Sequence, residues 1–481
     1  MGKVSRRQFL SRAALALGAT PILLATACQA PPAAPPPAAT KAPEAPAATK
    51  ASEKPTVAAT APAPAAQPTA APAQIKGTSL AILEGTYFVA AGQDLFKKMA
   101  QDWGQQNGVT VSTDFLNWPD LQPKIGAAVQ AGGIDIVELW PGWCFLYRDQ
   151  LVDLTDFANG VAQKGGGFAQ FVLNSSLDNG KYYALPIGNS GTSMNYRISW
   201  FKEAGADIPD PAVQAKEGKW PDWTWDQFFA FGKKLKAQGR PIGQALGHST
   251  GDPQSFAYPY MWSNGAMETE KDGKTIAFNK PEFVDAMKKF IQAWKDCYDE
   301  TGTSWDDNNN NRAFMSQQIC ATLNGSSIYI ASKKSAPDVA ADMNHTLMPK
   351  GPSGRFYQFS TRTLGILKKS KNIEGAKEFL KWFADDKQYG EWFRIQEGYQ
   401  VANTQKWATD PVWTKDPKIS VYTQNPKYGR DQGYAGQIGE KSSLAWSKYI
   451  VVDTFAKATQ SGDAKAAIEW GAEELKRIYG G

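Results

Sequence analysis

Histidine and cysteine are scarce in this 481-residue sequence. The two histidines, His248 and His345, lie far apart, without a nearby cysteine or paired acid. A histidine-based zinc site or a Ser-His-Asp triad needs several such partners, so the chain offers few candidates for either. We therefore expect ordinary loop or surface histidines. For the chain as a whole we also predict no metal, no cofactor and no enzyme activity.

Only four cysteines are present, at positions 28, 144, 297 and 320. Cys28 lies in the N-terminal region, ahead of the expected globular body, which leaves three cysteines, an odd number, in the rest of the chain. Outside the cytoplasm, Cys297 and Cys320 either form a disulfide or stay free and buried together with Cys144. The sequence leaves both alternatives open.

Long apolar runs are also missing from the N-terminal region. The stretch from Ala13 to Ala27 is interrupted by Gly18 and Pro21, and it is too short for a membrane-spanning helix of about 20 residues. It follows Arg6 and Arg7 in "SRRQFL", which resembles the twin-arginine export signal.

The segment "LATAC" at the end of this stretch resembles a bacterial lipoprotein box, with Ala25 where that motif usually has Leu. The resemblance implies cleavage after residue 27, lipid on the thiol of Cys28, and a protein anchored to the membrane outside the cytoplasm. Residues 1–27 are therefore predicted to be a signal peptide.

Residues 29–74 contain no aromatic residue and consist mostly of Ala, Pro, Thr and Lys. Such a composition buries too little apolar surface to offset the entropy of ordering, so residues 28–75 are predicted to be the lipidated cysteine and a disordered tether. Removal of residues 1–27 removes four basic residues and no acid, which lowers the net charge from +5 to +1. No basic stripe remains to suggest a nucleic-acid partner.

The remaining 400 or so residues are too many for one core, so we expect two lobes. "TSLAILEGTYF", "VTVSTDFLNW" and "IDIVELW" read as strands, and the segments between them read as amphipathic helices. This alternation predicts a parallel α/β lobe, in which ligands bind beyond the carboxyl ends of the strands. Those ends carry Glu84, Tyr87, Trp118, Trp140 and Trp143.

Helical patterns dominate the middle of the chain and predict a helix-rich second lobe. Thr224 and Gln227 have the spacing of a capping box, and Asn279 is the expected N-cap of a helix that contains Pro281 in its first turn. The acidic and amide run 306–311 lacks the Gly and Glu of a calcium loop, because Asn311 and Gln317 stand at those positions. We expect a polar loop there, without metal.

An ordered set of segments carries a resemblance to a known family: "DNGKYYALPIGNSGTSMNYRISWFKEAG", "WTWDQFFAFGKKL", "YMWSNGA", "AFMSQQICATLNGSSIY", "LMPKGPSG" and "SKNIEGAKEFLKWF". Between about Ser79 and Asn403 the chain resembles the extracellular solute-binding proteins of ABC importers, in the branch that includes maltose-binding protein. The resemblance implies a monomer that captures a mono- or oligosaccharide and delivers it to a membrane permease.

The implied fold is α/β, a two-lobe periplasmic-binding-protein fold with hinge strands. Residues 76–190 plus 362–402 would form the first lobe, and residues 191–361 plus 403–481 the helix-rich second lobe. The expected crossings lie near Asn189–Asn195, Phe359–Thr363 and Gln400–Asn403.

A sugar presents apolar faces that suit aromatic rings and a rim of hydroxyls that needs paired polar groups, because a buried unpaired polar group costs about 1–3 kcal/mol. The cleft is favoured for Trp143, although Trp143 and Trp118 could instead pack in a core. Asn324 could be a turn residue, and Arg362 could form a structural salt bridge. The candidate ligand-binding residues are Glu84, Tyr87, Trp118, Trp140, Trp143, Asn189, Trp262, Asn264, Asn324, Arg362 and Tyr399.

Two alternatives stand beside the sugar receptor. An exported glycoside hydrolase would need two carboxyl groups about 5–5.5 Å or about 6.5–9.5 Å apart, for which Glu84 and Glu138 are the candidates. The same fold could instead bind a non-sugar solute such as a polyol.

Overall fold

The computed structural model describes residues 79–480, apart from the side chains of Gln170, Phe171 and Asn189. The predicted signal peptide with Arg6 and Arg7 and the predicted tether that starts at Cys28 lie outside the described residues. Between residues 79 and 480, no helix combines the length and the apolar character that a membrane span requires.

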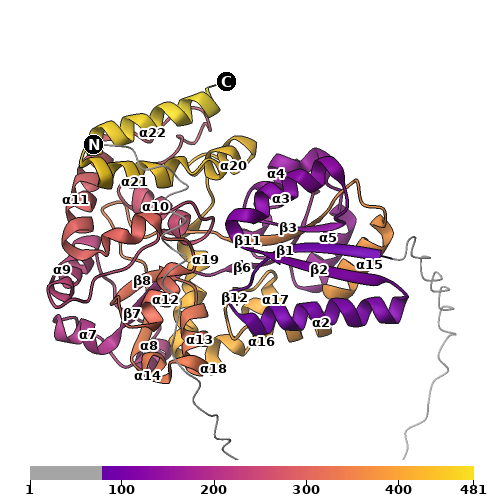
Figure 1. Ribbon diagram of the computed structural model, residues 1–481, viewed down its shortest axis with the longest axis horizontal. Helices are drawn as coiled ribbons and strands as arrows, with labels where there is room; N and C mark the ends of the chain where they lie inside the picture. The colour runs from indigo at the N-terminus through magenta and orange to yellow at the C-terminus, as the bar shows by residue number, and fades with distance from the viewer. Residues whose placement is uncertain (1–78, 481) are drawn as a thin grey trace, which may run out of the picture. The chain divides into compact units, whose positions relative to one another are not determined.

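A six-stranded sheet with the order β12-β6-β11-β3-β1-β2 defines the first lobe (Figure 1). Strand β1 pairs in parallel with β2 and β3, which confirms the predicted parallel arrangement, whereas β11 runs antiparallel to β3 and β6. The strands are β1 (Ser79–Gly85), β2 (Thr110–Leu116), β3 (Ile136–Leu139), β6 (Leu185–Ser190), β11 (Thr361–Ile366) and β12 (Gln400–Val401).

Both faces of this sheet are covered, because neighbouring strand residues belong to different clusters. Ile82 and Ile136 pack with residues of α2, α15 and α16, whereas Leu83 and Val137 pack with residues of α3 and α4. All four residues of β3 are buried. The helices are α2 (Ala90–Asn107), α3 (Trp118–Ala131), α4 (Trp143–Tyr147), α5 (Thr155–Lys164), α6 (Gln170–Leu173), α15 (Ile373–Phe383) and α16 (Asp386–Ile395); a hairpin of β4 (Leu177–Asp178) and β5 (Lys181–Tyr182) follows α6.

A three-stranded antiparallel sheet with the order β8-β7-β9 defines the second lobe, and helices dominate around it (Figure 1). Its strands are β7 (Ser193–Arg197), β8 (Ala321–Asn324) and β9 (Met343–Thr346). Its helices are α7 (Ile198–Glu203), α8 (Pro211–Glu217), α9 (Trp225–Lys236), α10 (Asp252–Ser263), α11 (Pro281–Cys297), α12 (Asn309–Met315), α13 (Ser327–Ser335) and α14 (Pro337–Ala341).

The predicted capping box of α9 is confirmed. The hydroxyl of Thr224 accepts a hydrogen bond of 3.2 Å from the backbone of Gln227, whose side chain accepts one of 2.9 Å from the backbone of Thr224. The predicted N-cap of α11 was wrong by one residue: Lys280, in extended conformation before Pro281, is the N-cap instead of Asn279. A residue before proline is pushed toward extended geometry, which moves the helix start forward.

The chain passes between the two sheets at Gly191 and Thr192, since β6 ends at Ser190 and β7 begins at Ser193. Strand β10 (Tyr357–Gln358) precedes the return into β11 and pairs in parallel with β13 (Gly429–Arg430), which follows much later in the chain. The predicted domain boundaries stay a prediction. Beyond β12 lie α17 (Gln405–Ala408), α18 (Val412–Lys415), α19 (Asn425–Tyr428), α20 (Glu440–Ser447), α21 (Ile450–Ser461) and α22 (Ala464–Tyr479).

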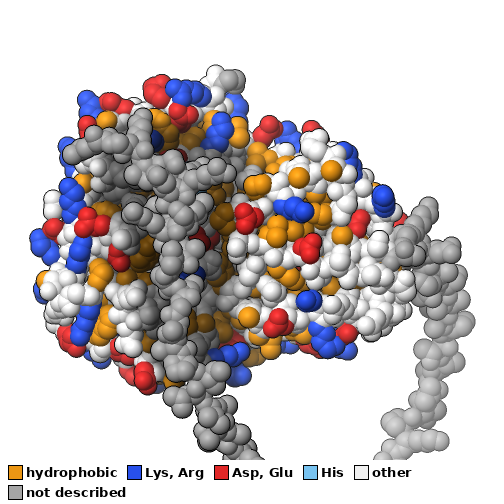
Figure 2. Space-filling view, in the orientation of Figure 1, with side chains coloured by type: hydrophobic (Ala, Val, Ile, Leu, Met, Phe, Trp, Pro, Cys, Tyr) orange, Lys and Arg blue, Asp and Glu red, His pale blue; other side chains and the backbone are white. Residues whose placement is uncertain are grey.

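The three cysteines in the described part are buried and free, so the alternative with free thiols applies to Cys144, Cys297 and Cys320. On the surface, basic and acidic side chains are interspersed over the face shown in Figure 2.

Candidate functional site

A closed cavity of about 30 Å³ lies between residues of the two lobes. A space of this size holds about one water molecule, whereas ligand pockets measure about 300–1,000 Å³, so the lobes have shut upon each other. The lining residues are Phe88, Trp140, Ser190, Gly191, Thr192, Gly251, Asp252, Ser255, Asp307, Asn324, Gly325, Ser360 and Tyr399.

Aromatic rings form the first-lobe side of this cavity. Trp140 directly follows β3, beyond the carboxyl end of that strand, and stacks on Trp118 with ring centroids 4.6 Å apart. Phe88 also stacks on Trp118, with ring centroids 6.5 Å apart, and its ring lies 6.5 Å from the ring of Tyr399. Trp118 itself does not line the cavity; it supports Trp140 from behind, with its indole N–H donated to the carbonyl of Thr86.

Carboxylate and amide groups form the second-lobe side. Oδ2 of Asp252, at the start of α10, accepts hydrogen bonds from the amides of Asn310 (2.6 Å) and Asn324 (2.9 Å). Asp307 accepts hydrogen bonds from the backbone N–H groups of Asp252 (2.8 Å) and Gly251 (3.1 Å). The starts of α10 and α12 and the end of β8 thereby meet at one point.

Burial disfavours the charge of both carboxyl groups. It raises the pKa of Asp252 well above its ordinary value, and the neighbouring Asp307 adds to this shift. Burial likewise raises the pKa of Asp307 to about 6, although two backbone N–H groups act in the opposite direction. A ligand that donates hydrogen bonds would therefore stabilise the ionised form of the two acids that line the cavity.

The floor of the cavity comes from the crossing between the lobes. Asn425 holds this crossing, because its amide donates to the carbonyl of Thr192 and its oxygen accepts from the N–H of Thr192, both at 2.8 Å. Gly325 approaches closely from β8: a Cβ at this position would lie 2.9 Å from the ring of Tyr399 and 3.2 Å from the carbonyl of Gly191. Only glycine fits there without displacement.

Glu84, Tyr87 and Arg362 form a buried ion cluster inside the first lobe instead of lining the cavity. Arg362 pairs with Glu138 and, at 3.2 Å, with Glu84, which also accepts a 2.6 Å hydrogen bond from the hydroxyl of Tyr87. Burial and the charge of Glu138 raise the pKa of Glu84 to about 8. Arg362 therefore forms a structural salt bridge, which was one of the two alternatives that the sequence left open for it.

Three further candidates also lie outside the lining. Trp143 packs in the first-lobe cluster that includes α3, and Trp262 lies edge-to-face with Tyr258 at 5.4 Å inside the second lobe. Asn264 ends α10, with its amide donated to the carbonyl of Tyr260. Asn189 lies in β6, paired with Thr361 and Val401, and its side chain is outside the described part. Of the sequence candidates, Trp140, Asn324 and Tyr399 meet at the cavity.

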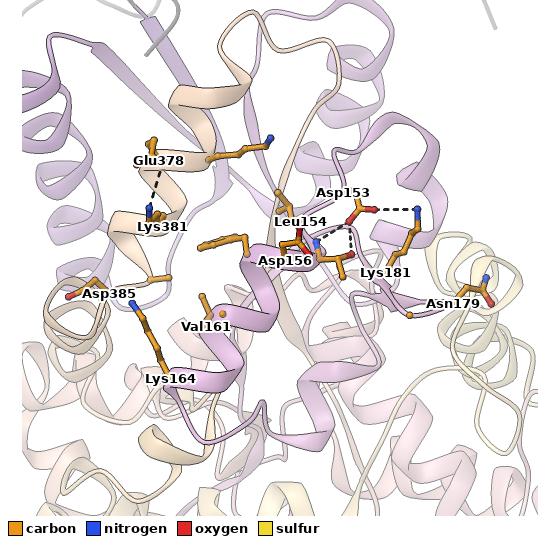
Figure 3. Close-up of a pocket in the computed structure, with 16 residues that line it drawn as sticks. Asp153, Leu154, Asp156, Val161, Lys164, Asn179, Lys181, Glu378, Lys381 and Asp385 are labelled. Carbon is orange, nitrogen blue, oxygen red and sulfur yellow. Dashed lines mark hydrogen bonds and ion pairs between the residues drawn. The ribbon is translucent and has the colours of Figure 1, made fainter. Parts of the chain in front are cut away.

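A larger pocket of about 1,030 Å³ lies on the first lobe between α5 and α15 (Figure 3). Its rim carries both signs of charge: Asp153 pairs with Lys181, and Lys381 with Glu378. Among residues 79–480, no group of three or more His, Cys, Asp or Glu residues is placed to hold a metal ion.

The family profile described as bacterial extracellular solute-binding protein matches residues 98–421 of this chain. The chain belongs to this family. Among relatives of this solute-binding protein, the lactose-binding protein of Rhizobium radiobacter is 24% identical over 235 residues, which cover 48% of each chain.

Solved structures show the same two-lobe periplasmic-binding-protein fold. The maltose-bound MalE3 protein of T. maritima matches with a TM-score of 0.72 and 18% identity, over 83% of this chain and 99% of its own. A ribitol-bound ABC transporter solute-binding protein of Agrobacterium radiobacter matches with a TM-score of 0.70 and 19% identity, over 84% and 99%.

Sequence reasoning missed Asp252, Asp307 and Phe88 as cavity residues of this solute-binding protein. From the sequence, Asp307 was considered only as part of a calcium loop. Its position just before α12 could have indicated a carboxylate that accepts hydrogen bonds from backbone N–H groups. Asp252 stands before Pro253 at the start of a helix whose twelve residues are all buried, so a charged side chain there needed a partner. Phe88 lies only four residues beyond Glu84, past the end of β1.

Proposed function

We propose that this solute-binding protein captures a mono- or oligosaccharide between its lobes and delivers it to an ABC permease. One observation supports the ligand class most strongly: rings of Trp140 and Tyr399 on one side of the cavity oppose the Asp252, Asp307 and Asn324 side chains on the other. Rings suit the apolar faces of a sugar, and carboxylate and amide groups suit its hydroxyls. The lactose-binding relative and the maltose-bound neighbour agree with this class.

The ligand enters an open form and closes it. The cavity of about 30 Å³ is too small for a sugar, so the lobes must separate by hinge motion at the strand crossings. A permease distinguishes loaded from empty protein only if ligand changes the population of the closed form. A shift from 1:99 to 99:1 takes about 5.5 kcal/mol of differential affinity.

The proposal extends to location and assembly. We infer export through the signal with Arg6 and Arg7, lipid attachment at Cys28, and a monomer held at the outer side of the cell membrane. The family, whose members are extracellular solute-binding proteins, supports the extracytoplasmic position. The two N-terminal motifs support the lipid anchor.

We further propose binding without turnover. Glu84 and Glu138, the pair on which the glycoside hydrolase alternative depends, are both engaged by Arg362 and lie outside the cavity lining. Incubation with chromogenic glycosides should release no chromophore above background. Release that disappears in an Asp252→Asn variant would favour the enzyme.

A polyol is the second candidate ligand, supported by the ribitol-bound neighbour. Tryptophan fluorescence and thermal shift of the full chain against a panel of sugars and polyols distinguish the two classes. Ligand at 100 times Kd adds about 2.7 kcal/mol of stability, which raises Tm by a few degrees. A response to sugars supports the proposed carbohydrate function. A response to polyols alone would show that the cavity binds polyols instead. No response to either class would contradict both assignments.

A further inference from the structure

The interlobe cavity is lined by acidic side chains without a basic one. Two of the residues that line it, Asp252 and Asp307, carry carboxyl groups, and none of the lining residues is Lys or Arg. Asp252 is only 8% exposed and Asp307 only 3%. Two acids in so small a space repel each other when both are ionised, and closure of the lobes removes the water that would screen them.

The partners that these two carboxyl groups have are neutral. Asp252 is held by the amides of Asn310 and Asn324, and Asp307 by backbone N–H groups. These dipoles reduce the cost of burial but supply no counter-charge. The buried cation of the first lobe, Arg362, is committed to Glu138 and Glu84.

Asp252 also keeps one acceptor free. Both of its amide hydrogen bonds end on Oδ2, and within residues 79–480 no donor is placed on Oδ1. Thr192, 6% exposed and on the same cavity, has a hydroxyl without a hydrogen-bond partner in the described part of the chain. The unpaired buried hydroxyl of Thr192 and the open acceptor Oδ1 of Asp252 indicate contacts that a ligand completes.

The opposite wall suits a cation as well as a sugar face. Trp140, Tyr399 and Phe88 present aromatic rings to the cavity, and an ammonium group over such a ring is attracted by its quadrupole. A ligand with hydroxyls alone would pair the free oxygens but would supply no positive charge to stabilise the ionised form of either acid. A ligand with an anionic group would add to the repulsion.

We infer that the preferred ligand is a carbohydrate that carries a protonated amine, an amino sugar, with its ammonium group at Asp252 and Asp307 and its ring against Trp140. This inference rests on the proposed carbohydrate function and narrows it. An amine there donates hydrogen bonds to Oδ1 of Asp252 and supplies the missing positive charge, while the hydroxyls reach Thr192.

Calorimetric titration of the full chain at neutral pH tests the charge preference directly. The probes are amino, neutral and acidic members of matched series: glucosamine, glucose and glucuronic acid, their galacto and manno counterparts, and the glucosamine dimer against cellobiose. We expect an amino member to bind at least about tenfold more tightly than its neutral parent, and the acidic member to bind more weakly than both. Asp252→Asn should reduce the amino-to-neutral ratio below about threefold.

The control variant is Asp285→Asn, which removes an exposed carboxylate on α11 that pairs with Lys288. It should leave the ratio unchanged, and thermal melts should show that both variants fold. Neutral sugars that bind as tightly as their amino counterparts would overturn this inference and leave the carbohydrate function intact. A chain that binds neither amino nor neutral carbohydrates would overturn both.

Discussion

The indole N–H of Trp140 donates a 2.6 Å hydrogen bond to the hydroxyl of Thr250, and the two residues belong to different lobes. Trp140 follows the central strand β3 of the large sheet, and Thr250 precedes α10 of the second lobe. The contact lies next to the cavity that Trp140 lines and helps to hold the lobes shut. It therefore links the ligand site to closure.

Replacement of Trp140 by Phe should favour the open form. The variant keeps a ring but removes the N–H, which leaves the buried hydroxyl of Thr250 without this donor at a cost of about 1–3 kcal/mol in the closed state. Small-angle scattering without ligand should show a larger radius of gyration than for the unmodified protein. Trp225→Phe is the matched control, because its indole bonds Ser263 within the second lobe. An equal increase in the radius of gyration of both variants would contradict the role of the Trp140–Thr250 hydrogen bond in holding the lobes closed.

Replacement of Arg362 by Leu should destabilise the first lobe strongly. It leaves Glu84 and Glu138 buried without their cation, and breaking a buried pair costs about 3–5 kcal/mol. Urea unfolding measures this loss. Lys98→Ala, which removes an exposed pair with Asp102 on α2, should change the free energy of unfolding by less than about 0.5 kcal/mol. Similar small losses for both variants would show that the cluster is not structural.

Replacement of Gly160 and of Gly429 by alanine should change the stability of the protein in opposite directions. Gly160 lies within α5, and a Cβ there meets no atom within 4 Å, so Gly160→Ala should stabilise the protein by about 0.5–1 kcal/mol. A Cβ on Gly429 would lie 1.9 Å from the ring of Phe359, so Gly429→Ala must displace that ring and lower Tm. Melting curves of the two variants check both signs. A rise in Tm for Gly429→Ala would mean that the ring moves freely.

Glu268 should give the protein a pH-dependent stability. The carboxyl accepts hydrogen bonds from Tyr258 (2.6 Å) and Tyr479 (3.0 Å), but its burial raises its pKa from 4.5 to about 7. Between these values the folded state binds more protons than the unfolded one, so this group costs stability as pH rises, by about 3 kcal/mol once pH exceeds 7. Above pH 7 the loss is complete.

The difference between the unmodified protein and Glu268→Gln isolates this effect. His345 was expected in a loop or at the surface, which was wrong, because it lies fully buried in β9. Burial lowers its pKa to about 4, so it acts in the opposite direction between about pH 4 and 6.5 and cancels in the difference. Urea unfolding at pH 5 and pH 8 should show the variant gaining relative to the unmodified protein at the higher pH. A constant difference across this range would rule out the titration of Glu268.

Local patterns predicted most of the first lobe. The strands β1, β2 and β3 and the helices between them follow from hydrophobic periodicity, and the parallel pairing follows from their alternation. On α2 the apolar side chains of Phe96, Met99 and Trp103 are buried, whereas Leu95 is only partly buried. The position of Trp140 beyond the end of β3 needed only the rule that ligands bind at the carboxyl ends of parallel strands.

Long-range geometry accounts for what the sequence could not supply. Trp140 and Trp143 are three residues apart, yet one lines the cavity and the other begins α4 and packs inward. Asp252, Asp307 and Asn324 are distant in sequence and meet only because α10, α12 and β8 converge. The sequence around Arg362 was equally compatible with a ligand contact and with a salt bridge. The salt bridge forms because Glu84 and Glu138, which lie on other strands, come next to Arg362 in the folded lobe.

A crystal structure of the full chain with the carbohydrate that raises Tm most tests the central claim most directly. Our account predicts sugar density between the lobes, in contact with the ring of Trp140 on one side and with Asp252 on the other. Density confined to another surface, such as the pocket between α5 and α15, with the interlobe cavity still closed at its present size, would contradict it.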